Sequence, residues 1–152
     1  MDSALEPVGN ALYKVLNVPS LVGTYAAGVC AGVKKVWPKP PTNVQPGDFP
    51  LVWFELASED TRSGLGRGPW LLELDVRVHT FVVSDMNDAQ RITREVVRLL
   101  RAHETDTLPV AGWSPWYQPH DRNVLLPFEQ LAGLPVTELV TMGRLYVEEP
   151  AA

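Results

Sequence analysis

The sequence predicts an α+β fold, in which a mostly antiparallel β-sheet with one long β-hairpin is covered on one side by two main helices. Residues 3–16 and 88–103 each repeat apolar residues at three- and four-residue spacing, the pattern of an amphipathic helix. Between these segments, residues 70–79 alternate between apolar and mostly charged residues, the pattern of a long strand with one buried face. Strands that precede and follow a long helix in this order favour an antiparallel sheet with its helices on one side.

The composition is that of a globular protein, and we expect one domain over residues 1–152. Hydrophobic residues make up 45% of the chain and charged residues 20%, so a buried core is expected. The net charge of −5 provides no basic field for gripping nucleic acid. A single cysteine, Cys30, excludes an intrachain disulfide, and the most apolar stretch, residues 18–33, is too short to cross a bilayer. We therefore expect a protein that is made and folds in the cytoplasm and does not enter a membrane.

The first third of the chain predicts a helix, a short strand and a long loop. The helix at residues 3–16 ends before Pro19, which cannot continue it. Residues 21–31 are rich in small side chains and fit either a short second helix or a packed loop. Residues 34–37 predict a short strand, and the prolines and glycine of residues 38–50 predict a long, rigid loop.

A strand pair with a polar tip follows. Residues 51–56 are a run of β-forming residues and predict a buried central strand. Residues 59–68 are polar and rich in glycine, as expected for the exposed tip of a hairpin. The long strand at residues 70–79 then places an apolar set on one face, and on the other it places Glu73, Asp75, Arg77 and His79.

The second helix has an apolar stripe and an arginine-rich back. The arginines lie almost opposite the stripe, at Arg91, Arg94, Arg98 and Arg101. They fit either a contact with an acidic neighbour or a solvated surface, on which Glu95 pairs with nearby arginines at about 0.3 kcal/mol each. After residue 104 the pattern loosens: residues 113–119 are aromatic and proline-rich, residues 124–126 fit a short strand, and residues 136–147 fit one long or two short strands.

The residue types that carry catalysis do not gather into a motif. None of the three histidines has the spacing of a metal site, and His79 is expected at the surface or at an interface. The pair His120–Asp121 has no serine in a nucleophile elbow to act on. The glycines of residues 64–68 precede a strand and not a helix, so a hairpin tip is favoured over a phosphate loop. We expect no catalytic residues, no metal and no cofactor.

Five consecutive segments, within residues 5–101, resemble the tail-terminator (tail-completion) proteins of long-tailed bacteriophages and related phage-like particles. In chain order they read ALYKVLNVPSLVG, VKKVWPKPP, FPLVWFEL, SEDTRSGLGRG and WLLELDVRVHTFVVSDMNDAQRITREVVRLLR. They correspond to a helix, a short strand ending in prolines, a hydrophobic strand after an aromatic-proline pair, a glycine-rich hairpin tip, and a long strand that runs into an amphipathic helix. Two segments, residues 20–33 and 105–134, are longer here than the resemblance leads us to expect.

The resemblance implies a non-enzymatic virion protein that is assembled in the host cytoplasm and located in the tail or neck. Such a protein forms a hexameric ring of itself on the head-proximal end of the tube built by the major tail-tube protein. The ring ends tube polymerisation and docks the head–tail connector or stopper protein, while DNA passes through it without sequence-specific binding.

The expected contacts of such a ring fall into two sets. Candidate subunit contacts are Glu73, Asp75, Arg77, His79, Arg91, Arg94 and Arg98, and candidate docking-loop residues are Arg62, Leu65, Arg67, Pro40, Asp48, Trp113 and Trp116. Two alternatives remain open: another neck component, such as a head-completion stopper, and a small monomeric ligand-binding or enzymatic α+β domain that uses His120 and Asp121.

Overall fold

A computed structural model describes residues 5–59, 71–83, 86–108, 110, 114–131 and 134–148. Two α-helices and five strands follow one another in the order α1 (Leu5–Leu16), β1 (Lys35–Trp37), β2 (Leu51–Glu59), β3 (Leu71–Val82), α2 (Met86–Arg101), β4 (Ser114–Leu131) and β5 (Leu134–Glu148), with one 3₁₀ turn at Pro46–Asp48. The predicted α+β class is confirmed.

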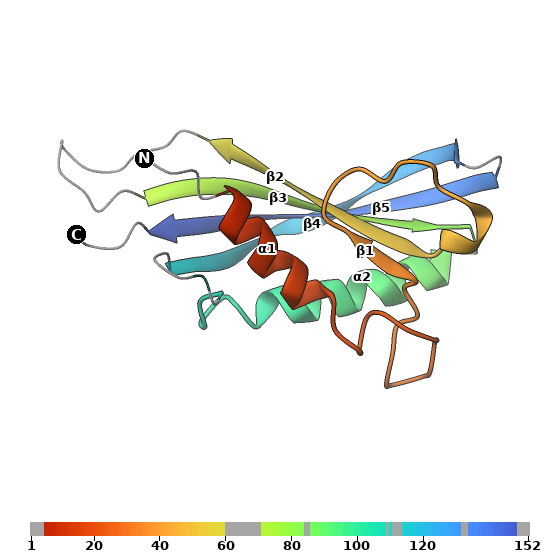
Figure 1. The fold of residues 1–152 in the computed structure, drawn as a ribbon, viewed down its shortest axis with the longest axis horizontal. Coiled ribbons are helices and arrows are strands. Elements are labelled where there is room, and N and C mark those ends of the chain that lie inside the picture. The colour runs from red at the N-terminus through yellow and green to blue at the C-terminus, as the bar shows by residue number, and fades with distance from the viewer. Residues whose placement is uncertain are drawn as a thin grey trace.

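The described strands form one mixed sheet with the order β1-β2-β3-β5-β4. β1 pairs with β2 in parallel, and the other neighbours are antiparallel. The long strand predicted from the alternating pattern is β3, which lies at the centre of the sheet. Figure 1 shows a strongly twisted sheet. The top-to-bottom order of the strands at one end of the sheet is reversed at the other end. The two ends therefore turn opposite faces of the sheet toward the viewer.

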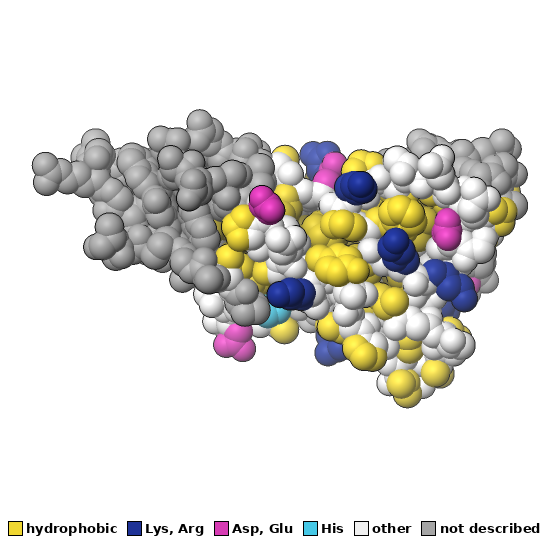
Figure 2. Space-filling model, viewed as in Figure 1, with side chains coloured by type: hydrophobic (Ala, Val, Ile, Leu, Met, Phe, Trp, Pro, Cys, Tyr) yellow, Lys and Arg dark blue, Asp and Glu magenta, His cyan; other side chains and the backbone are white. Residues whose placement is uncertain are grey.

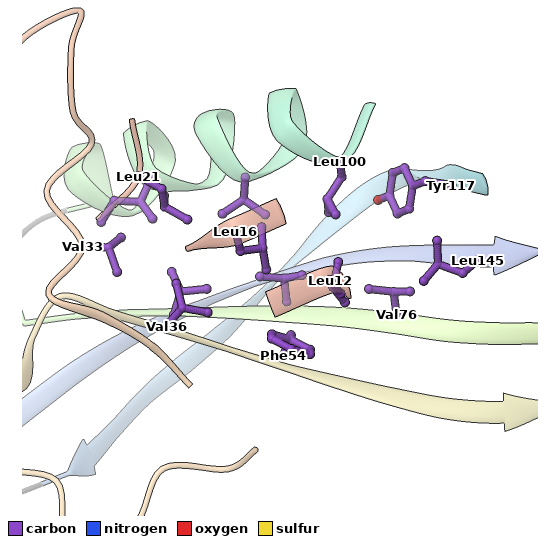
Figure 3. Close-up of a cluster of buried hydrophobic side chains, with 14 of the residues drawn as sticks. Leu12, Leu16, Leu21, Val33, Val36, Phe54, Val76, Leu100, Tyr117 and Leu145 are labelled. Carbon is purple, nitrogen blue, oxygen red and sulfur yellow. The ribbon is translucent and has the colours of Figure 1, made fainter. Parts of the chain in front are cut away.

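Both helices pack on one face of the sheet, as predicted. α1 contacts β1, β2 and α2, while α2 contacts β3, β5 and β4. Alternate residues of the strands meet the apolar stripes of the helices and form one core; ten of its residues, from both helices, the strands and the segment that joins α1 to β1, are labelled in Figure 3. Leu12, Leu16 and Ile92 are completely buried, and burying each side chain contributes about 1.5–3 kcal/mol.

The predicted helix bounds agree with the structure where it describes them. The helix expected at residues 3–16 is α1, and the helix expected at residues 88–103 is α2, which begins two residues earlier and ends at Arg101. Within the described part of the chain, no helix has the length and apolar character needed to cross a membrane.

The short strand expected at residues 124–126 lies within a much longer one, and the loose aromatic segment expected at residues 113–119 is wrong for residues 114–119. Residues 114–131 form β4, an edge strand of 18 residues that pairs with β5 and carries register shifts between Pro119 and Asn123 and between Leu126 and Glu129. Prolines argue against a central strand but are tolerated on a sheet edge and at bulges, where no partner needs the missing N–H. The closing strand expected at residues 136–147 is one long strand, β5.

Gly143 and Tyr117 fix the close approach of β4 and β5. The buried Tyr117 side chain lies against Gly143, at the place where a Cβ on that residue would overlap two ring carbons and the hydroxyl oxygen. Burial raises the pKa of the Tyr117 hydroxyl to about 12 because the phenolate would lose its hydration. The backbone N–H of Tyr117 donates to the carbonyl of His103 at 2.8 Å, which ties β4 to the chain that follows α2.

Candidate interaction surfaces

The charged face of β3 lies on the side of the sheet that the helices leave uncovered, which we call the open face. Its register aligns Asp75 with Arg144 and Arg77 with Glu55. Arg144 Nε donates to Asp75 Oδ1 at 3.3 Å, and Arg77 lies 3.9 Å from Glu55 across the neighbouring strand. All four side chains are partly exposed, so the pairs keep access to solvent and to a docking protein.

A shallow hollow of about 160 Å³ opens between β3 and β5 beside these pairs. It is lined by Asp75, Arg77, Met142 and Arg144, together with Val76 and Gly143. Charges of both signs therefore surround a depression in the open face, which favours a specific polar contact over a broad electrostatic one.

His79 is also on the open face but is buried, whereas the sequence predicted a surface or interface histidine. Its ring stacks on Trp53, with ring centroids 3.9 Å apart and an angle of 4° between the planes. Nδ1 contacts the buried carboxylate of Glu138, and Nε2 lies 3.2 Å from Glu55 Oε1. Which ring nitrogen donates and which accepts depends on the tautomer of the imidazole. The covering residues come from neighbouring strands, which periodicity within one strand does not reveal.

A second apolar cluster covers one end of the open face. Phe49, Leu51, Phe81 and Val136 are buried there, with Trp37, Val44 and Trp53 packed against them. Residues 38–50 cross in front of the sheet at this end in Figure 1, and Figure 2 shows hydrophobic side chains gathered in this part of the view. Only part of the β3 face that the sequence predicted to be charged and solvated is therefore exposed.

The proline-rich segment of residues 38–50 is a candidate docking loop that packs on its own domain. Its 3₁₀ turn is held by Asp48, whose carboxylate accepts a hydrogen bond of 2.8 Å from the Gln45 backbone. Phe49 anchors the segment in the second apolar cluster. Pro40 stays exposed and Asp48 partly exposed, so both remain accessible to a partner.

The arginines of α2 lie on the opposite side of the molecule, against the segment that joins α1 to β1. Arg91 is partly buried, and Arg94 and Arg98 are exposed. Together with Tyr25 and residues 27–31, these three arginines line a hollow of about 450 Å³. Glu95 accepts hydrogen bonds from Arg98 and from Ser20, and these bonds lower the pKa of its carboxyl group.

Several predicted contact residues lie where the structure gives no account of them. Arg62, Leu65, Arg67 and Trp113 lie outside the described residues. For Glu73 in β3 and Trp116 in β4 only the backbone is described, in register with Tyr146 in both cases. For His120 and Asp121 in β4, too, only the backbone is described.

Among the described residues, no group of three or more histidine, cysteine or carboxylate side chains is arranged to hold a metal ion. His79 and its two carboxylates form a cluster of three titratable groups, and the stacked Trp53 ring covers one face of the imidazole. We assign it to structure, because both ring nitrogens already contact carboxylates of the protein. The sequence matches no protein-family model and no curated protein.

Proposed function

We propose that this protein is a tail terminator of a long-tailed phage or phage-like particle. It forms a hexameric ring on the head-proximal end of the tail tube, ends tube polymerisation and joins the tail to the head connector. The sequence resemblance supports this proposal, and so does the fold, in which the resembling segments become two helices on one side of a mostly antiparallel sheet.

The observation that carries the proposal is the placement of the two charged patches. Asp75 and Arg77 are on the open face of the sheet, whereas Arg94 and Arg98 are on α2, beyond the opposite face. A ring built from one kind of subunit needs two different surfaces that meet head to tail, because contact between identical patches closes a dimer. Two polar patches on opposite sides of the domain meet this requirement.

Charge supports the same reading. The chain carries a net charge of −5, and an acidic ring would let DNA pass without gripping its backbone. The partly exposed pairs on the open face, Asp75 with Arg144 and Arg77 with Glu55, leave hydrogen-bonding capacity for a neighbouring copy, for the tube or for the connector.

Tail length in particles that lack the protein tests the proposal. Deleting the gene from the genome that encodes it should give tails of abnormal and variable length in electron micrographs, and supplying the gene from a plasmid should restore the length. Purified protein added to polymerising tube protein should also shorten the tubes. Tails of normal length that fail to attach to heads would indicate a stopper, and normal joined particles would indicate a monomeric domain outside assembly.

A further inference from the structure

A hollow lies between the back of α2 and the segment that joins α1 to β1. Arg91, Arg94, Glu95 and Arg98 line one wall, at the spacing of a single helix face. Tyr25 and residues 27–31 line the other wall, and the hollow between the two walls measures about 450 Å³. The sequence left this segment open between a short helix and a packed loop, and the structure shows a packed loop with bridges from Val22 to Val33 and from Ala26 to Cys30.

The loop wall is held to the helix by specific contacts. Arg91 donates from Nε and Nη2 to the carbonyl of Ala31 at 3.2 and 3.1 Å, and its guanidinium lies 3.9 Å from the centre of the Tyr25 ring. Gly32 has a φ of +90°, and a Cβ there would come within 2.8 Å of the Tyr25 Cβ. The shape of the hollow is therefore set before anything binds, which lowers the entropic cost of binding.

The hollow is basic and has an exposed apolar rim. Its lining contains three arginines and one carboxylate, and that carboxylate, Glu95, is already bonded to Arg98 and Ser20. Arg94 is exposed and makes no hydrogen bond or ion pair with the described residues. At the rim, Val29 is 71% exposed and Tyr25 51%. The joining loop protrudes from the body in Figure 1, and hydrophobic side chains lie at its tip in Figure 2.

We propose that this hollow docks an acidic segment of a second copy of the chain. Guanidinium groups recognise carboxylates through paired hydrogen bonds, and the apolar rim suits a side chain next to such a carboxylate. The whole chain has a net charge of −5 although these arginines belong to it, so the remaining surface is more acidic than the total. The choice of a second copy as the occupant rests on the proposed ring, in which the α2 side of one subunit faces a different side of the next.

Self-association of purified variants tests the inference. Arg94→Glu reverses an exposed charge inside the hollow, and Val29→Asp places a carboxylate on its rim; neither side chain belongs to the core. Arg101→Glu is the matched control, because Arg101 is an exposed arginine of the same helix that does not line the hollow. We expect both test variants to weaken association at least tenfold in analytical ultracentrifugation, with the control within about twofold of wild type. Added salt should weaken wild-type association as well.

Three results separate the inference from the proposed function. If wild type forms rings and both Arg94→Glu and Val29→Asp form the same rings, the hollow is not an interface. The tail-terminator proposal would stay intact. If both variants weaken association but deletion of the gene leaves tail length normal, the hollow is supported as an interface. The tail-terminator proposal would then be overturned. A wild type that stays monomeric at the highest concentration reached would overturn the inference directly.

Discussion

Replacing His79 with phenylalanine tests the assignment of its buried cluster to structure. Phenylalanine keeps a flat ring to stack on Trp53 and removes both nitrogen atoms. Glu138, which is 7% exposed and in contact with His79 Nδ1, would then lose its hydrogen-bond donor inside the protein. We expect the variant to fold with a large loss of stability.

The magnitude follows from which carboxylate is left behind. Leaving a buried carboxylate without its hydrogen-bonding partner costs about 3–5 kcal/mol, because nothing then offsets its loss of hydration. The retained stacking places His79→Phe near the lower end, at about 3 kcal/mol. Glu55, the other partner, has a side chain that is 40% exposed and can turn to water. Glu55→Gln should therefore cost less than about 1 kcal/mol.

Urea unfolding of five proteins measures these values: wild type, the single variants His79→Phe, Glu138→Leu and Glu55→Gln, and one double variant. The double variant His79→Phe/Glu138→Leu removes the donor and the stranded charge together, and should lie within about 1 kcal/mol of wild type because an apolar pair can replace a buried ionic one. The cycle formed by wild type, the single variants His79→Phe and Glu138→Leu, and the double variant then gives a coupling free energy well above the scatter of independent sites. A loss below about 1 kcal/mol for His79→Phe, or no recovery in the double variant, would refute the reasoning.

Two further predictions concern the contact between β4 and β5. Gly143→Ala should lower the free energy of unfolding by about 1–3 kcal/mol, because the added methyl overlaps the Tyr117 ring, and equal melting curves for variant and wild type would contradict this contact. Native Tyr117 keeps its proton up to about pH 12, whereas in the unfolded chain it releases it near pH 10, so stability should fall by about 2–3 kcal/mol as the pH rises from 10 to 12. Tyr117→Phe should remove that part of the decline, and identical pH profiles for the two proteins would exclude it.

The fold could be predicted where one strand or helix carries its own signal. The alternation in β3 and the apolar stripe of α2 are both local patterns, and each identifies its element and its buried face without knowledge of the neighbours. Only residues 124–126 of β4 were expected as a strand, and its proline-rich first part was missed because prolines argue against a strand unless the strand lies at a sheet edge. Edge position is a property of the whole sheet, so no window of sequence around Pro115 or Pro119 contains it.

The exposure of the candidate surface residues could likewise be predicted only where it follows from the pattern of a single strand or helix. Asp75 and Arg77 lie on the face that the alternation assigns to them, and Arg94 and Arg98 are exposed on the back of α2. The covering of His79 was not foreseen, because it depends on Trp53 from β2 and Glu138 from β5. The hollow beside α2 was also missed, since it depends on how residues 20–33 fold back onto Arg91.

The open face has one end covered by residues 38–50 and one uncovered part, and this limits where a partner protein could dock on it. At the end covered by residues 38–50, a partner would have to displace buried side chains such as Phe49 and Phe81 before reaching the sheet. At the uncovered part, the carboxylate of Asp75 and the guanidinium of Arg77 are partly hydrated, so exchanging water or an intramolecular partner for an intermolecular one costs little. Of the charged residues first considered on β3, Asp75 and Arg77 therefore suit an interface, whereas His79 acts inside the domain to hold β2, β3 and β5 in place.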